Sequence, residues 1–193
     1  MANVQHLRHS PLEPRIQELE QASGDAVALR EVPFTTMVGL RAAPGSTGHE
    51  ALASALGGLP AQVGDVVGDV DSTAVLWLSP DEFLAVDQPD TGLAASLEST
   101  LGDNSGQVLD LSANRTFIEL SGEASEPVLR KTVPLDLHLR SWPVNKAYAT
   151  QVALTPVMVW RVAEHTWWIA PRISFADHVV NFLLDAMLEF REG

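Results

Sequence analysis

The chain has 193 residues, 46% of them hydrophobic, which is enough to bury a substantial core as one large domain or two small halves. It has 12 lysines and arginines but 25 aspartates and glutamates, and the resulting formal net charge of −13 makes nucleic acids and anionic membranes poor partners. The absence of cysteine excludes disulfides, cysteine nucleophiles and thiolate metal sites.

The N-terminus predicts an arm over about residues 1–24, attached to a single domain that takes up the rest of residues 1–193. The opening MANVQHLRHSPLEPR contains no apolar run of signal-peptide type. No stretch of the chain approaches the ~18 continuous apolar residues of a membrane span. We therefore expect a soluble, cytoplasmic protein.

A short helix is predicted within the arm, over residues 12–20. Its apolar residues Leu12, Ile16 and Leu19 lie on one face at helical spacing. That face would dock either on the chain's own domain or on another chain, and the sequence leaves both alternatives open.

Strand-like and helical patterns alternate in the next hundred residues. The strand-like stretches are residues 26–32, 34–42 and, with a turn at Pro80-Asp81, the two or three strands of 64–86. The first helix begins at a Thr47/Glu50 capping box and ends at Gly57-Gly58. The second is capped by Asp90 or Thr91, runs to Leu101 and stops at Gly102.

The second half repeats this alternation. Residues 106–122 read as a hairpin that turns at Ala113-Asn114, followed by a helix over 124–132 that Pro134 stops. Residues 147–172 are a strand meander with a turn near Glu164-His165, and a last helix opens at Ser174 and Asp177 and runs to Phe190.

This order predicts an α+β fold of mainly antiparallel sheets with helices on one face, because hairpins outnumber crossovers. The recurring unit of hairpin and helix has the form of an internal duplication of split β-α-β kind, although the sequence self-similarity is too weak to define a repeat.

Ser121-Gly122, at the end of a predicted strand, is a candidate nucleophile turn. A hydrolase elbow needs Gly-x-Ser-x-Gly, and Glu119 stands where the first glycine should be. We therefore interpret the pair as a corner, in which Gly122 takes a left-handed or tight conformation and Ser121 or Ser125 caps the next helix.

No other residue pattern predicts a chemical site. His6 and His9 have helical metal-ligand spacing but lie in the arm, and His49-Glu50 lacks the second histidine of a zinc-protease helix. The glycine-rich residues 57–69 lack a dinucleotide fingerprint and a phosphate-binding lysine. We predict no catalytic, cofactor-binding or metal residue in this chain.

The tryptophans indicate how the sheet is covered. Trp167 and Trp168 are neighbours in a predicted strand and point to opposite faces, while Trp142 lies in a loop, where it is harder to bury. One face of the strand would meet the chain's own helices, and the other would meet either the chain's own core or a partner. Our interface candidates are Leu12, Ile16, Trp142, Trp167 and Trp168.

Three segments together resemble a known family: WLSPDEFLAV (77–86), VLDLSANRTFIELSGEASEPVLRKTVPLDL (108–137) and RISFADHVVNFLLDAM (172–187). They are similar to the gamma subunit of bacterial heterotetrameric sarcosine oxidase. The resemblance extends from about Val38 to the end, and the middle segment is also typical of the wider folate-binding T-protein family, so it implies a T-protein-like fold.

The resemblance implies an accessory, non-catalytic subunit that packs against the alpha, beta and delta subunits, the alpha subunit most directly. The family's complex oxidises sarcosine to glycine with O2, giving H2O2 and either formaldehyde or 5,10-methylenetetrahydrofolate. It implies FAD, FMN, NAD and zinc in the other subunits, with tetrahydrofolate used by the complex.

One departure bears on folate binding by this chain. Folate-binding relatives carry a Lys-Gly-containing segment late in the chain, whereas residues 150–164, TQVALTPVMVWRVAE, contain neither lysine nor glycine. Two alternatives to an accessory subunit remain, a stand-alone folate-dependent enzyme of the aminomethyltransferase type and a solitary α+β binding protein.

Overall fold

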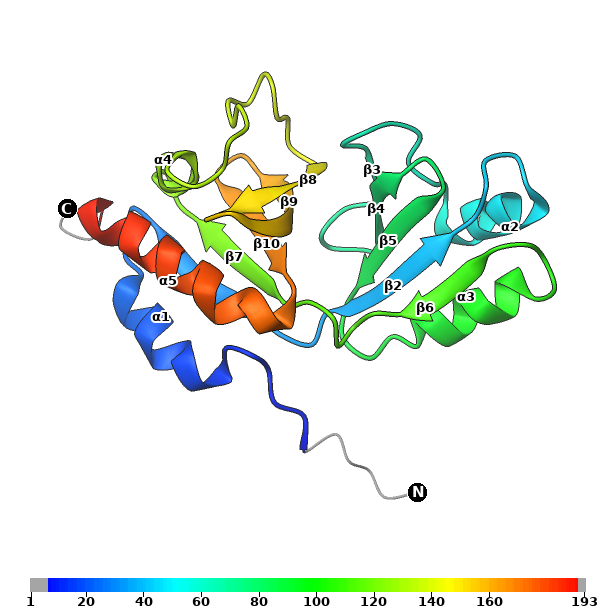
Figure 1. The fold of residues 1–193 in the computed structure, drawn as a ribbon, viewed down its shortest axis with the longest axis horizontal. Coiled ribbons are helices and arrows are strands. Elements are labelled where there is room, and N and C mark those ends of the chain that lie inside the picture. The colour runs from blue at the N-terminus through cyan, green and yellow to red at the C-terminus, as the bar shows by residue number, and fades with distance from the viewer. Residues whose placement is uncertain (1–6, 191–193) are drawn as a thin grey trace.

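The computed structural model describes residues 7–190, which form two five-stranded antiparallel sheets (Figure 1). The first sheet has the order β1-β7-β10-β9-β8 and the second the order β3-β4-β5-β2-β6. The strands of the first sheet are β1 (Ala28–Val32), β7 (Phe117–Ser121), β8 (Lys146–Val152), β9 (Thr155–Ala163) and β10 (Thr166–Pro171). Those of the second are β2 (Thr36–Arg41), β3 (Val66–Val67), β4 (Ala74–Ser79), β5 (Glu82–Asp87) and β6 (Gln107–Asp110).

Helices cover the outer side of each sheet, so the chain is built in four layers (Figure 1). Those on the first sheet are α1 (Ile16–Ala22), α4 (Ser125–Arg130) and α5 (Ala176–Met187), with short 3-10 turns η2 (Glu13–Arg15), η3 (Ile173–Phe175) and η4 (Leu188–Phe190). Those on the second are α2 (Thr47–Leu56) and α3 (Leu93–Leu101). No helix in residues 7–190 combines the length and the apolar character needed to cross a bilayer.

The two sheets have the same topology, with one strand exchanged between them. Each half of the chain runs strand, strand, helix, three strands, helix, beginning with β1 in the first half and β6 in the second. The first strand of each half pairs in the other half's sheet, because β1 pairs with β7 and β6 pairs with β2. This arrangement supports the predicted internal duplication, and the exchange joins the halves.

Three apolar clusters hold the layers together. One lies between the first sheet and α1, α4 and α5, and another lies between the second sheet and its two helices. The third fills the space between the sheets, where Leu76 and Leu84 of the second sheet meet Met158, Trp160 and Trp168 of the first. Burial on both faces explains why β9 and β10 are almost continuously apolar.

The predicted hairpin over residues 106–122 is wrong. Its two strands are β6 and β7, and they belong to different sheets. Residues 111–116 between them are a crossover, and residues 33–35 form the equivalent crossover between β1 and β2.

The helix ends were predicted better than the helix starts. Gly57 and Gly102 follow α2 and α3 with positive φ, as expected. The cap of α2, however, is Ser46, whose Oγ accepts from the His49 amide, and α3 follows Gly92 without a side-chain cap. The Thr47/Glu50 capping box and the Asp90 or Thr91 cap are therefore wrong.

The sheets are also tied at their β3 and β8 edges. The Lys146 ammonium lies 2.6 Å from the Asp65 carboxylate, and the Ala147 amide donates to the Gly64 carbonyl at 3.1 Å. The hydrogen bond from Lys146 holds the pKa of Asp65 below its ordinary value of 3.8, because it stabilises the charged carboxylate.

We expect Lys146→Met to lower the free energy of unfolding by about 0.5–1 kcal/mol at pH 7, the range for a partly exposed ion pair. Because the folded-state pKa of Asp65 is depressed, the contribution is present above about pH 4 and disappears as the pH falls through the folded pKa. Urea unfolding of both proteins at pH 7 and pH 3 measures the gap. A gap of equal size at both pH values would contradict the assignment to this pair.

Candidate functional site

The Ser121-Gly122 corner has a structural explanation. Gly122 has φ 105°, and a Cβ there would lie 2.4 Å from the Ala26 carbonyl oxygen. Ser121 ends β7 within the ladder, opposite Ala28 and Thr166. The predicted glycine corner is confirmed. The predicted serine cap is wrong, because α4 begins after Ala124 without a side-chain cap and the Ser125 hydroxyl donates to the His165 carbonyl instead.

We expect Ser121→Ala to change the free energy of unfolding by less than about 0.5 kcal/mol, because the Ser121 hydroxyl makes no hydrogen bond within residues 7–190. Ser125→Ala is the matched control. It removes the 3.1 Å bond from a fully buried hydroxyl and should cost about 1 kcal/mol. Thermal melts of the two variants make the comparison. A loss of stability in Ser121→Ala as large as that in Ser125→Ala would contradict the corner interpretation.

The described histidines make separate local contacts. His9 pairs with Glu13 on the arm, the His49 ring packs edge-on to Phe83, and the His178 ring packs against Phe182. His6 lies outside the described residues. Across residues 7–190 no three histidine or carboxylate side chains are grouped as metal ligands.

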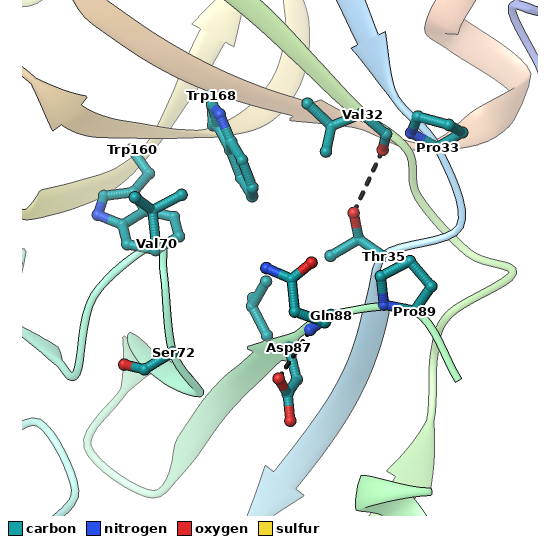
Figure 2. A pocket seen from close by; sticks show the side chains of 11 residues that line it. Val32, Pro33, Thr35, Val70, Ser72, Asp87, Gln88, Pro89, Trp160 and Trp168 are labelled. Carbon is teal, nitrogen blue, oxygen red and sulfur yellow. Dashed lines mark hydrogen bonds between the residues drawn. The ribbon is translucent and has the colours of Figure 1, made fainter. Parts of the chain in front are cut away.

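A small pocket of about 110 Å³ opens between the two sheets (Figure 2). The indole rings of Trp160 and Trp168 line one side, and Asp87 and Gln88 at the end of β5 lie opposite them. The crossover after β1 contributes Thr35. The pocket therefore lies beside the crossover from β1 to β2.

The polar groups of this pocket are mostly engaged within the chain. Asp87 accepts from Thr73 Oγ1 at 3.0 Å and from the Gln88 amide at 2.7 Å, and Thr35 Oγ1 donates to the Val32 carbonyl at 3.2 Å. The Trp168 indole donates to Glu119 at 2.9 Å. Neither histidine nor lysine is among the residues that line it.

Four of the five interface candidates are buried in the chain itself. Trp142 lies against Tyr148 and Trp167 with ring centroids 4.7 and 5.3 Å away, and Leu12 is in the same cluster. Trp168 lies in the cluster between the sheets. Trp142 is thus buried although it lies in a loop, and the burial of Leu12 shows that the arm docks on its own domain. Only Ile16, 45% exposed, presents its side chain to the surface.

These features define a class, an α+β chain with a duplicated, strand-exchanged pair of antiparallel sheets. A chain of this architecture is found in aminomethyltransferase T of the glycine cleavage system from Bartonella henselae, whose crystal structure matches 88% of this chain and 48% of that chain with a TM-score of 0.64. The identity is 16%, so this likeness shows the fold alone. The expected α+β, T-protein-like fold is confirmed.

The sequence places the chain more narrowly. The model of the sarcosine oxidase gamma subunit family matches residues 42–189, and the chain belongs to this family. It is 54% identical over 186 residues to sarcosine oxidase subunit gamma of Arthrobacter sp, covering 95% of this chain and 92% of that protein. It is 53% identical over 194 residues to the subunit of Corynebacterium sp. (strain U-96), covering 98% and 95%.

A solved structure agrees with this placement. A chain of the heterotetrameric sarcosine oxidase from Corynebacterium sp. U-96, in complex with pyrrole 2-carboxylate, matches 97% of this chain and 98% of that chain with a TM-score of 0.93 and 53% identity. The family resemblance of the three quoted segments is thereby confirmed.

Proposed function

We propose that this chain is the accessory gamma subunit of a heterotetrameric sarcosine oxidase. The observation that carries the proposal is identity above 50% along nearly the whole length of sarcosine oxidase gamma subunits, including a chain from a heterotetrameric enzyme. The complex oxidises sarcosine to glycine with O2 in the cytoplasm. Its products are H2O2 and formaldehyde or 5,10-methylenetetrahydrofolate.

The chain's role in the complex is structural rather than catalytic. The engaged polar groups of the pocket between the sheets and the scattered histidines support this role. The flavins FAD and FMN, NAD and zinc are held by the alpha, beta and delta subunits, and the alpha subunit is the most direct contact. Ile16 on α1 is an exposed apolar side chain available for such a contact.

Purification of the tagged chain from its native source tests the proposal. We expect the other three subunits in stoichiometric amounts by mass spectrometry, and sarcosine-dependent H2O2 formation by the purified complex. Recovery of the chain alone would overturn the proposal. Folate-dependent one-carbon transfer by the isolated chain would instead favour the stand-alone aminomethyltransferase alternative.

A further inference from the structure

Two arginines meet at the crossover between the sheets without a carboxylate partner. Arg115 lies just before β7 and Arg172 just after β10, and the two residues form an isolated antiparallel bridge. Side chains directly opposite each other in such a bridge project from the same face, with Cβ atoms about 5 Å apart, and like charges there are destabilising. The two positive charges therefore repel each other, and an anion bound between them would relieve this repulsion.

Most other lysines and arginines of residues 7–190 form ion pairs, so the lack of one at both Arg115 and Arg172 is unusual. Eight of the eleven lysines and arginines in residues 7–190 form ion pairs, and the exceptions are Arg115, Arg140 and Arg172. Arg140 and Arg172 are exposed, whereas Arg115 is half-buried. The pKa of Arg115 is lowered by its burial and then by the positive charge of Arg172, with no carboxylate acting against this.

Most N–H donors of the Arg115 guanidinium have no hydrogen-bond partner within residues 7–190. Nη1 donates to the Ala170 carbonyl at 2.9 Å, and no further hydrogen bond reaches this guanidinium from residues 7–190. Arg115 lines an open groove of about 820 Å³ beside Ile173. The groove's two carboxylates have other partners, because Asp90 pairs with Arg8 at 2.8 Å and Asp110 accepts from the Ser112 hydroxyl at 2.6 Å.

Within residues 7–190 no carboxylate forms an ion pair with Arg115 or Arg172. An anion from another molecule can therefore bind there without displacing a carboxylate of the chain.

The surface next to the arginines indicates a protein as its source. Ile173 and Phe175, which follow Arg172 directly, are each 44% exposed, as is Phe182 two turns along α5. Arginine beside exposed aromatic and aliphatic side chains is the composition of a protein interface, where the apolar contacts exclude water from the charged anchor. A free hydrated anion would gain nothing from these neighbours.

We propose that Arg115 and Arg172 are an anchor that receives an aspartate, glutamate or C-terminal carboxylate from a partner subunit of the oxidase, with Ile173 and Phe175 packed around it. This inference rests on the proposed function and adds the place and chemistry of one contact. Two guanidinium groups on one face can hold a carboxylate by several charge-assisted hydrogen bonds, and the incoming charge relieves their mutual repulsion.

A zero-length cross-link tests the contact in the assembled complex. Arg172→Lys keeps the positive charge and supplies an amine, which a carbodiimide joins to a carboxylate in direct contact with it. We expect peptide mass spectrometry to find one new link, absent from the wild-type complex, between position 172 and an acidic residue or the C-terminus of another subunit. Arg140→Lys is the matched control, since Arg140 also lacks an ion pair, and should give no such link.

Charge reversal gives an independent measurement. Arg172→Glu should reduce the fraction of this chain that stays bound to the other subunits after dilution at least tenfold, because it places two carboxylates together. Arg140→Glu should leave that fraction unchanged. The anchor proposal is wrong if the complex assembles without the new cross-link, or if Arg172→Glu and Arg140→Glu lose equal fractions of bound chain. Either result leaves the proposed function unaffected. A wild-type chain that does not co-purify with oxidase subunits overturns both.

Discussion

Replacing Gly122 by valine should prevent the chain from folding, at a cost of more than about 3 kcal/mol. Gly122 has φ 105°, a conformation that strains any residue with a Cβ. A Cβ there would also lie 2.4 Å from the Ala26 carbonyl oxygen and 2.9 Å from its carbon, which are backbone atoms next to the exchanged strand β1. Neither contact can be relieved by rotating a side chain, so β1 would have to leave β7.

Gly24→Val is the matched control for this prediction. Gly24 lies in the turn before β1, and nothing comes within 4 Å of a Cβ placed on it. We expect that variant to accumulate as soluble chain and to melt within a few degrees of the wild type, whereas Gly122→Val should yield little soluble chain. Equal yields and melting temperatures would show that the corner tolerates a side chain and that its packing against β1 is not essential.

Much of the fold follows from local patterns in the sequence. The last helix was predicted from the 3.6-residue period of its apolar side chains, and Val179, Leu183 and Met187 are buried along α5. The turn at Glu164-His165 joins β9 to β10 as predicted. In each case neighbouring residues decide the structure, so no long-range contact was needed for the prediction.

The exchange of β1 and β6 could not be predicted in this way. Alternation of apolar residues tells which face of a strand is buried but not which strand lies beside it. Two consecutive strands with a short link read as a hairpin, and β6 and β7 have that pattern although they pair in different sheets. The β8–β9 turn gave no sequence signal either, because Ala153 and Leu154 take positive φ where asparagine and glycine are usual.

Candidate site residues were harder to place than strands, for a related reason. Trp142 is an interface candidate because a loop residue is harder to bury, yet residues 134–145 fold back over the first sheet and bury it. The arginine pair has no local sequence motif, because Arg115 and Arg172 are 57 positions apart. Both features depend on contacts between distant segments, which a single sequence does not reveal.

Arg161 is the side chain that holds this loop, and Arg161→Met should lower the free energy of unfolding by about 3–5 kcal/mol. The guanidinium is 1% exposed and donates to the carbonyls of Leu137 and Trp142 at 2.9 Å and of Glu164 at 2.6 Å. It also lies 4.5 Å from the centroid of the Trp167 ring. Methionine fills much of the same volume but leaves three carbonyl groups without this donor in a buried region.

Arg130→Met separates this effect from the loss of a positive charge. The Arg130 side chain is 60% exposed and pairs with Glu126 four residues earlier on α4, so its removal should cost less than about 1 kcal/mol. Chemical unfolding compares the stabilities, and hydrogen exchange locates the change. We expect faster exchange over residues 134–145 in Arg161→Met, because the loop would lose its ties to β9 while the sheet ladder stays intact. If the two variants lose equal stability, or if exchange rises evenly along the chain, then the loop is held by the packing of Trp142 rather than by the arginine.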